Sequence, residues 1–427
     1  MRIAFITLGC KLNYAETSTY ERGFTAAGLQ TVPWSEGADV FLVNTCSVTR
    51  HSDYKCRNII SKCHRISPSA TIVVTGCYAS LRRDEVSSLP GVRLVFSSDE
   101  KSRVVPKTLA LLGLEGLDEA PPKPLSPAIS SGGSADIIPA YSYGERTRSF
   151  LKVQDGCDNF CAYCTVPYAR GRSRNLPICE IVRQAKEIAS RGVKEIVLTG
   201  VNTGDFGRST GESFLNLIQA LNEVEGIERY RISSIEPNLL TEEIIAWIAS
   251  GTKFLPHFHI PLQAGCDSIL RSMGRRYDTA LFESRIGLIR SGMETPGRAK
   301  VFFGIDVIAG LPGESEEKFE EGYRFLRDRI HPAYLHIFPY SPRPGTRAAA
   351  MGGQVQDRVK TGRVARLQEL CDALHREFVE TNRGLPERVL WEKAEKGGLM
   401  SGYTGNYIRI EAPYDPSKVG KIEDIVI

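Results

Sequence analysis

Short apolar runs recur along the first 112 residues and alternate with amphipathic stretches of helical spacing. Each run spans only a few residues and is rich in β-branched side chains, which favours buried strands. The runs lie at 3–8, 40–43, 72–74 and 94–96. Strands that alternate with helices are typical of a doubly wound parallel sheet, and we expect an α/β fold of this kind for residues 1–112.

A second series of apolar runs and helical patterns extends from about residue 147 to residue 371. It contains six strand candidates, each followed by a stretch that can form a helix. These candidates lie at 150–153, 195–199, 231–235, 258–262, 301–309 and 334–339. Six βα units predict an open or closed α/β barrel.

The periodic pattern fails between the two series and changes again near the end of the chain. Residues 113–142 contain a proline-rich run at 121–124 and a serine- and glycine-rich run at 130–134, so we expect a linker there. After a helix expected at 368–382, short strands at 388–391, 407–411 and 422–426 predict a small β-barrel. The expected domains are therefore 1–112, 143–373 and 374–427.

Composition agrees with two or three ordinary globular domains. Hydrophobic residues make up 42% of the 427 residues and charged residues 24%. The first residues lack the long apolar stretch of a signal peptide, and no membrane span is visible, so we expect a cytoplasmic chain without a membrane partner. The net charge of +4 is too small to demand a nucleic-acid partner.

Three of the eleven cysteines form a compact motif, Cys157-x3-Cys161-x2-Cys164, directly after the first strand of the second series. The carboxyl ends of barrel strands are where active sites lie. Four-iron clusters normally take four cysteine ligands, so three close thiolates leave one iron free for a non-protein ligand. A zinc knuckle is the alternative, but no fourth Cys or His follows at zinc spacing.

Three further cysteines share a position relative to predicted strands. Cys10, Cys46 and Cys77 each follow an apolar run of the first series. In a parallel sheet the carboxyl ends of the strands meet at one edge, so these thiols should converge into a second site with three ligands. The alternative is that they are small buried residues at strand ends.

The remaining cysteines and two histidines carry less information. Packing is the expected role of five cysteines: Cys56 and Cys63 on one helix face, and Cys179, Cys266 and Cys371. His257 and His259 alternate along a predicted strand and should face the barrel interior or the substrate, without forming a metal site.

Together these motifs resemble the radical S-adenosylmethionine (SAM) methylthiotransferases over essentially the whole chain. The matching stretches are 9–13, 44–48, 76–79, 156–174, 198–202, 260–265, 276–277 and 306–314, and the last segment resembles the TRAM RNA-binding module. The resemblance implies a partial (β/α)6 barrel with a SAM-binding 4Fe-4S cluster on the Cys157 set, and an auxiliary 4Fe-4S cluster on Cys10, Cys46 and Cys77. It also implies a SAM pocket lined by Tyr163, Asn202, Ser234, Glu236 and Gln263.

The sequence Gly9-Cys10-Lys11-Leu12-Asn13, followed by Glu16-Thr17, is most similar to the branch that methylthiolates threonylcarbamoyladenosine in tRNA. This similarity implies methylthio transfer to C2 of the adenosine beside the anticodon, with an electron donor such as a flavodoxin or ferredoxin and a monomeric enzyme. Branches that act on isopentenyladenosine or on a ribosomal-protein aspartate share both cysteine motifs. Rivals of another class are an iron-sulfur electron carrier and an RNA-binding protein with a structural metal.

Two basic stretches are candidates for binding the phosphates of the anticodon stem-loop. The first contains Arg170, Arg172 and Arg174, and the second contains Arg343, Arg347, Arg358, Lys360, Arg363 and Arg366 against a single acid, Asp357. A solvated helix face is the alternative for either stretch. Residues 374–427 hold eight basic and nine acidic residues, so an RNA role for the tail follows only from the resemblance.

Overall fold

The computed structural model describes residues 1–114, 137–144 and 146–427, so most of the expected linker lies outside the described residues. The amino-terminal domain is a parallel sheet in the order β2-β1-β3-β4-β5. Its strands are β1 (Arg2–Thr7), β2 (Gln30–Thr31), β3 (Val40–Thr45), β4 (Thr71–Gly76) and β5 (Val92–Val95). All four predicted strands are present, and β2 is an additional short edge strand.

Helices cover both faces of this sheet, as predicted for a doubly wound fold. One apolar cluster joins the sheet to α2 (Arg50–Ile66), α3 (Cys77–Leu81) and α4 (Arg83–Ser87). A second cluster joins the opposite face to α1 (Lys11–Ala26) and α5 (Val104–Leu111). Short 3₁₀ turns occur at Trp34–Glu36 and Lys101–Arg103.

The central domain is an open arc of six parallel strands, which confirms the partial barrel. Its two halves have the orders β10-β9-β6 and β11-β12-β13. They meet where the amide of Ile235 donates to the carbonyl of His259 at 3.1 Å. The strands are β6 (Ser149–Lys152), β9 (Glu195–Thr199), β10 (Arg229–Ile232), β11 (His257–Gln263), β12 (Phe302–Ala309) and β13 (Tyr334–Pro339).

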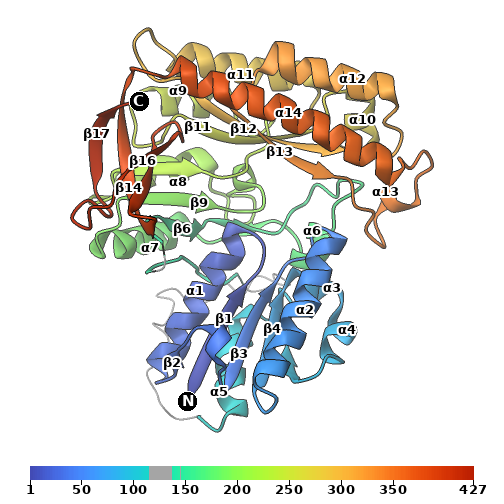
Figure 1. Ribbon diagram of the computed structural model, residues 1–427, viewed down its shortest axis with the longest axis vertical. Helices are drawn as coiled ribbons and strands as arrows, with labels where there is room; N and C mark the ends of the chain where they lie inside the picture. Colours follow the sequence, from blue (N-terminus) through green and yellow to red (C-terminus); the bar gives the residue numbers. More distant parts are fainter. Residues whose placement is uncertain (115–136, 145) are drawn as a thin grey trace.

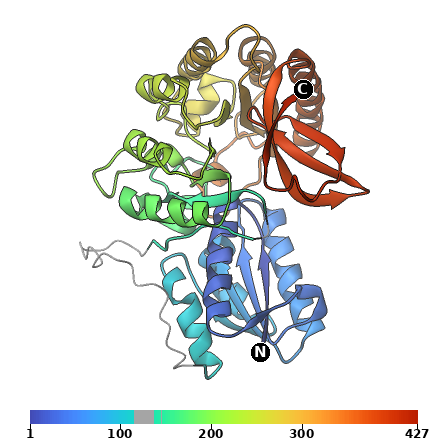
Figure 2. The ribbon, with the colours of Figure 1, turned by 90° about the vertical axis from the view of Figure 1, so that its left-hand side faces the viewer.

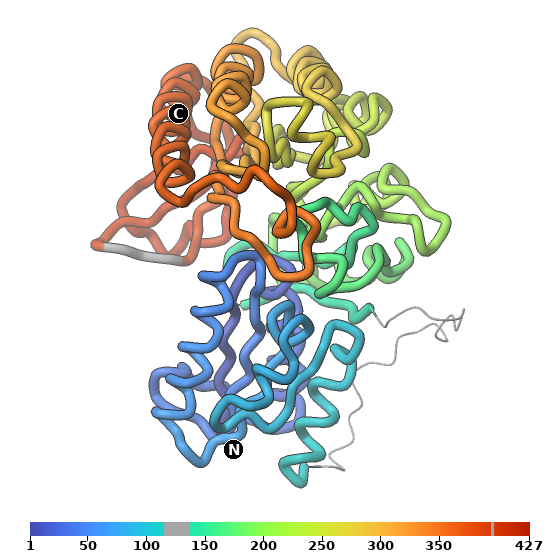
Figure 3. The backbone as a smooth tube through the Cα atoms, turned by 90° about the vertical axis from the view of Figure 1, so that its right-hand side faces the viewer, coloured from blue at the N-terminus to red at the C-terminus, as the bar shows by residue number. Residues whose placement is uncertain are grey.

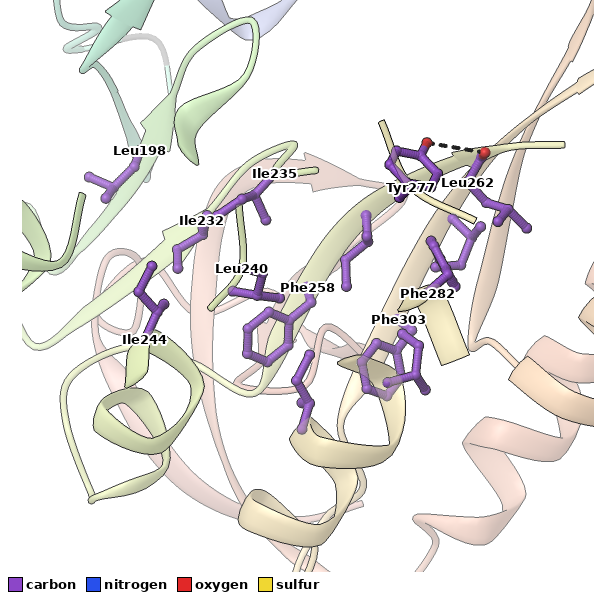
Figure 4. Close-up of a cluster of buried hydrophobic side chains, with 14 of the residues drawn as sticks. Leu198, Ile232, Ile235, Leu240, Ile244, Phe258, Leu262, Tyr277, Phe282 and Phe303 are labelled. Carbon is purple, nitrogen blue, oxygen red and sulfur yellow. Dashed lines mark hydrogen bonds between the residues drawn. The ribbon is translucent and has the colours of Figure 1, made fainter. Parts of the chain in front are cut away.

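Helices line the outer face of the arc (Figure 1). Figure 4 shows this outer core, where Ile232 of β10, Phe258 of β11 and Phe303 of β12 pack together with helical side chains such as Phe282. The helices and helical turns are α6 (Val166–Arg170), α7 (Ile178–Ser190), Thr203–Asp205, α8 (Phe214–Asn222), α9 (Glu242–Ala249), α10 (Asp267–Ser272), α11 (Thr279–Met293), α12 (Glu316–Arg324) with a π-helical continuation to Ile330, α13 (Arg347–Ala350) and α14 (Asp357–Thr381). A two-residue pair, β7 (Gln154–Asp155) with β8 (Arg174–Asn175), closes the loop after β6.

Two expectations for the end of the chain differ from the structure. The last helix, α14, begins at Asp357, earlier than the predicted start at 368, and it runs unbroken through the boundary expected at 373. The carboxyl-terminal domain is a four-stranded antiparallel sheet of order β16-β15-β14-β17, curled into a half-barrel (Figure 2). Its strands are β14 (Pro386–Lys396), β15 (Leu399–Thr404), β16 (Arg409–Pro413) and β17 (Ile422–Val426).

Polar contacts fasten the amino-terminal sheet to the arc. Glu16 of α1 and Asp155 of β7 are buried and share the cations of Lys101, Lys152 and Arg170, with the Lys101 Nζ to Glu16 Oε1 distance at 2.7 Å and both Lys152 contacts at 2.9 Å. This group is called the Glu16 network below. It joins α1 and the turn Lys101–Arg103 of the first domain to β6, β7 and α6 of the central domain, and all of its charged side chains are buried.

The second contact comes from the loop after β13, drawn in orange, which reaches the top of the amino-terminal domain (Figure 3). Arg343 of this loop is buried and donates to Ser47 Oγ at 2.8 Å and to Asp53 Oδ2 at 2.7 Å. A further contact joins α1 to the segment beside β6, where Arg22 donates to the carbonyl of Tyr141 at 3.0 Å.

The half-barrel is fastened to the amino ends of β9 and β10. Arg229 and Arg231 share the carboxylate of Glu195, at 2.6 and 2.8 Å. Arg229 also donates to the carbonyls of residues 388 and 403, and Arg231 donates to those of Thr404 and Gly405. The curled sheet therefore covers this end of the arc.

Candidate active site

Cys10, Cys46 and Cys77 lie at one edge of the amino-terminal sheet, as predicted. Cys10 caps α1 after β1, Cys46 follows β3, and Cys77 begins α3 after β4. β1 and β3 are neighbours, and the strand order reverses between them, which is where open parallel sheets bind ligands. Burial, with smaller contributions from the nearby thiols of Cys77 and Cys10, raises the pKa of Cys46 to about 11.

Two glycines allow the cysteine loops to approach this closely. Gly9 has a φ of +103°, and a Cβ there would lie 2.8 Å from the Cβ of Cys46. Gly76 has a φ of +97°, and its Cβ would lie 2.4 Å from the carbonyl oxygen of Thr45. Both positions need the left-handed region and the space that only glycine offers.

Polar side chains then fix the loops. Asn13 donates to the carbonyls of Leu8 and Thr45, at 2.8 and 3.0 Å, and so joins the loops that carry Cys10 and Cys46. The hydroxyl of Thr45 donates to the carbonyl of Thr75 at 2.6 Å, which ties in the Cys77 loop. Buried Cys56 has the packing role expected for it, and its thiol donates to the carbonyl of Cys46 at 3.3 Å.

The Cys157 set occupies the loop between β7 and α6, beyond the carboxyl end of β6. The amide of Asn159 donates to Cys157 Sγ at 3.5 Å and that of Val166 to Cys164 Sγ at 3.4 Å, and such bonds favour the thiolate form. Burial, with a smaller contribution from nearby Cys161, raises the pKa of Cys157 to about 11 and that of Cys164 to about 12. The three thiols therefore lie close together in a weakly hydrated loop.

Arg275, which sequence reasoning missed, is the main cation of this loop. It is buried, with Nη1 donating to Cys161 Sγ at 3.1 Å and Nε donating to the hydroxyl of Tyr277 at 2.9 Å. Its Nη2 lies 2.6 Å from Glu236 Oε1. The neighbouring pair Arg276-Tyr277 belongs to a motif noted above, and that proximity was the only signal in the sequence.

Three of the five expected SAM-pocket residues, Tyr163, Asn202 and Glu236, are connected to the Cys157 loop by hydrogen bonds, and Ser234 and Gln263 lie at the carboxyl ends of β10 and β11. The side chain of Asn202 accepts from the amide of Glu236 at 3.2 Å, and Glu236 accepts from Asn159 at 2.8 Å. Tyr163 lies next to Arg275, whose Nη1 is 3.5 Å from the phenol oxygen. Ser234 follows β10 and accepts through its carbonyl from Thr203, whereas Gln263 ends β11 with a φ of +70°.

The two cysteine sets are linked through Arg170. This arginine ends α6, the helix that follows Cys164, and α6 packs against α3, which begins with Cys77. Burial raises the pKa of Cys77, and the hydrogen-bonded guanidinium of Arg170 opposes that shift. Arg170 also reaches Asp155 Oδ1 at 2.9 Å in the Glu16 network. The carboxyl ends of the first sheet and of β6 therefore face each other.

The structure divides the nine basic residues expected to bind RNA into two groups. Four are at least partly exposed: Arg172, Arg347, Arg358 and Arg366. Five are buried and hold internal partners: Arg170, Arg174, Arg343, Lys360 and Arg363. The charge pattern did not distinguish the groups, because contacts such as those of Arg343 with Asp53 and of Arg363 with Glu314 join residues far apart in the sequence. Only the exposed four present free surface to a phosphate.

Three polar side chains gather on the inner face of the arc. His259 Nε2 and Asp306 Oδ1 are 2.6 Å apart, and His336 lies near both, with the His259 and His336 ring centroids 4.7 Å apart. Their ligand atoms all lie within 4.8 Å of one another. His257 and His259 face inward as expected.

Each cysteine set fits an iron-sulfur cluster on chemical grounds. Three thiols can hold a four-iron cluster and leave one iron for a non-protein ligand. Amide donors to sulfur and buried arginines beside both sets can offset the negative charge of a thiolate-bound cluster. Beside the Cys157 set, Asn202, Glu236 and Tyr163 would offer polar groups suited to SAM.

Family comparisons divide the chain in the same way. Residues 2–97 match the family described as "Uncharacterized protein family UPF0004", and residues 151–326 match the "Radical SAM superfamily". A solved radical S-adenosylmethionine methyltransferase, TsrM from Kitasatospora setae, aligns with a TM-score of 0.56 at 14% identity, covering 94% of this chain and 80% of that one. That likeness concerns the fold alone.

Full-length relatives are more specific. The "Threonylcarbamoyladenosine tRNA methylthiotransferase MtaB" of Bacillus subtilis is 36% identical over all of this chain and 93% of its own length, and that of Aquifex aeolicus is 37% identical over all of both chains. A "tRNA-2-methylthio-N(6)-dimethylallyladenosine synthase" of Nitratidesulfovibrio vulgaris is 31% identical over 99% of this chain and 94% of its own. With both cysteine sets in place, the chain belongs to the radical SAM tRNA methylthiotransferase family, in the threonylcarbamoyladenosine branch.

Proposed function

We propose that this protein adds a methylthio group to C2 of N6-threonylcarbamoyladenosine next to the anticodon of tRNA. The observation that carries this proposal is the pairing of two three-cysteine sets across a fixed domain interface. Such an interface can bring two reactive centres to one base. The full-length similarity to relatives that bear this activity in their names supports the choice of substrate.

Two 4Fe-4S clusters and SAM supply the radical, the methyl group and the sulfur chemistry when bound. The residues of the chain bind and orient these groups. Cys157, Cys161 and Cys164 would hold the SAM-binding cluster, and Cys10, Cys46 and Cys77 the auxiliary cluster. The SAM pocket would be lined by Tyr163, Asn202, Ser234, Glu236 and Gln263, and Arg275 would place positive charge beside Cys161.

The tRNA anticodon stem-loop would lie across the mouth between the two sheets. Exposed Arg172, Arg347, Arg358 and Arg366 can contact its phosphates, which position the backbone without reading bases. Arg172 also lies 4.9 Å from the ring of exposed Phe160, which pairs edge-on with Tyr168. Exposed aromatic rings of this kind can stack on unpaired bases.

Further parts of the proposal concern organisation and partners. We place the domain limits at 1–112, 113–142 and 143–381, with the TRAM-like half-barrel after α14, because the helix is continuous to Thr381. The eleven free cysteines would suit the reducing cytoplasm, where thiols stay reduced. We further propose that the enzyme is a monomer and that a flavodoxin or ferredoxin supplies its electrons. Among the described residues, none of the helices is long and apolar enough to cross a membrane.

The test offers the reduced, cluster-loaded enzyme three anticodon stem-loops: unmodified, isopentenyl-modified and threonylcarbamoyl-modified. Mass spectrometry should find a methylthio group only on the threonylcarbamoyl substrate. Product from the isopentenyl substrate alone would move the chain to another branch. So would product from a ribosomal protein alone, when such a protein is offered in a separate reaction. Electron paramagnetic resonance separates the electron-carrier alternative, because SAM should alter the spectrum of the Cys157 cluster but not that of a simple carrier.

A further inference from the structure

Helix α1 enters the inner side of the arc and directs Lys11 toward it. Residues three and four apart share one face of a helix, so Lys11 lies on the same face as Tyr14 and Ala15. Tyr14 packs edge-on against Phe150 of β6, with ring centroids 6.5 Å apart, and Ala15 packs in the same cluster. Phe150 points inward, because its neighbour Leu151 packs under the outer helices. Lys11, one turn earlier, therefore also faces the inner side.

The inner face opposite Lys11 is lined by aromatic and imidazole rings. His257 lies 4.7 Å from the ring of Tyr407, which reaches in from the half-barrel. His259 lies two residues further along the same strand, β11, and His336 lies on β13, with the two rings 4.7 Å apart. Lys11, His259, His336 and Tyr407 all keep part of their surface accessible. Below, these residues together with His257 are called the inner-face cluster.

The acidic side chains around the inner-face cluster are already paired with basic side chains. The carboxylate of Glu195 is already shared by Arg229 and Arg231, and that of Asp306 is bound by His259. Arg148, beside Tyr407, is paired with Glu392 at 2.7 Å. In the described part of the chain, no hydrogen bond or ion pair holds the ammonium of Lys11.

The electrostatic field agrees with this arrangement. Burial raises the pKa of Tyr407, but Arg148, Lys11 and Arg231 outweigh it, and the pKa of this phenol is lowered overall. Burial lowers the pKa of His257 well below its usual value, and nearby Arg231 and Lys11 add to that shift. Both groups thus sense a positive potential that favours an anionic ligand and disfavours a bound metal cation.

We propose that the ammonium of Lys11 binds the carboxylate of the amino acid carried on N6 of the substrate adenosine, against the rings of the inner-face cluster. This inference rests on the proposed function and deepens it. A threonylcarbamoyl group ends in a carboxylate, whereas an isopentenyl group is hydrocarbon. Since Lys11 follows Cys10 directly, a base anchored here lies beside the auxiliary cysteine set. Lys11 would then be a specificity-determining residue.

The experiment compares two stem-loops, one with threonylcarbamoyladenosine and one in which its carboxylate is replaced by the neutral carboxamide. We expect the wild-type enzyme to prefer the carboxylate substrate by about 10- to 100-fold in kcat/KM, the usual strength of a hydrogen bond to a charged group. Affinity measured by fluorescence anisotropy should change in the same direction. Lys11→Met should act on the two substrates alike, and Lys11→Arg should retain the preference.

Lys107→Met, which removes an exposed lysine of α5, is the matched control and should behave as the wild type. All proteins are first compared at equal iron content. If Lys11→Met does not take up iron, the wild type and Lys11→Arg decide the question. A wild type that treats both substrates equally, or a Lys11→Met that keeps the full preference, overturns the inference. Product from the isopentenyl substrate alone would instead contradict the proposed function.

Discussion

At the scale of single residues, Arg275 shows how much of the site depends on side chains without a motif of their own. Its guanidinium touches Cys161, Tyr277 and Glu236, which come from three different segments. Sequence spacing identified Cys157, Cys161 and Cys164 because they lie close together along the chain, and their position after predicted strands identified Cys10, Cys46 and Cys77. Arg275 is more than a hundred residues away from Cys161 in the sequence, so no short motif connects the two residues.

Replacement of Arg275 by Met should therefore destabilise the protein strongly. The change leaves Glu236 buried without its cation, and breaking a buried pair costs about 3–5 kcal/mol. The thermal midpoint should fall by at least about 5 °C in scanning calorimetry. Arg276→Met is the matched control, because Arg276 is exposed and donates only to the carbonyl of Asp158. Equal midpoints for the two variants would contradict the central position given to Arg275.

The two cysteine sets should also be separable residue by residue. A triple replacement of Cys10, Cys46 and Cys77 by Ala should lower anaerobic iron content from about eight to about four atoms per chain. The variant should still release 5′-deoxyadenosine under reduction, because the Cys157 loop is intact, yet form no methylthio product. Normal product formation by this variant would exclude a sulfur-donor role for the auxiliary set.

At the scale of elements, the short apolar runs located every strand of the arc, because each strand carries apolar side chains that pack into the core under the outer helices. Strand β15 was missed. Gly402 resembles a turn residue, but it lies inside β15, where a Cβ would come within 2.6 Å of the carbonyl oxygen of Leu390. Glycine marks close packing here, and a sequence alone does not separate that case from a turn.

Helix α14 was predicted too short for a related reason. Its first half buries Lys360 and Arg363, whose partners include Asp357 and Glu314. Charged residues on the buried face hide the apolar periodicity that identifies a helix. The same residues were predicted to bind RNA, so their burial and their pairing inside the protein account for both differences.

The glycine loops give a prediction at this scale. Gly76→Ala should abolish the auxiliary site, since the new Cβ meets the backbone of Thr45 and the left-handed φ disfavours alanine. Iron content should fall to about half while SAM cleavage persists. The control is Gly287→Ala in α11, where nothing lies within 4 Å. There alanine should stabilise the helix by up to about 1 kcal/mol. Full iron content in Gly76→Ala would contradict the packing argument.

At the scale of the whole molecule, the Glu16 network predicts how the stability of the folded protein depends on pH. Burial alone would raise the pKa of Glu16, but the positive charges of Lys101, Lys152 and Arg170 outweigh the effect of burial. The pKa of Glu16 is therefore lowered from 4.5 to about 2. The resulting stabilisation is complete above about pH 4.5 and is lost as pH falls toward 2, in total about 3 kcal/mol. Denaturant unfolding followed by tryptophan fluorescence between pH 7 and 3 measures this loss.

Glu16→Gln provides the comparison for that measurement. This variant should already be less stable at pH 7, because three buried cations lose a shared anion, and its stability should fall less steeply in acid. If wild type and variant lose stability in parallel below pH 4.5, Glu16 does not carry the effect.

The fastenings between the first sheet and the arc determine which partner must change shape during a catalytic cycle. Arg170 holds the interface beside Cys77, and Arg343 holds it beside Ser47, the residue after Cys46. An enzyme so preorganised spends little of its binding energy on its own rearrangement. The deformation falls on the nucleic acid, whose target base must leave its stack at a cost of a few kcal/mol. Anticodon loops in which this adenosine is already weakly stacked should therefore be the better substrates of a preorganised enzyme. The flexibility of the RNA then contributes to substrate selection.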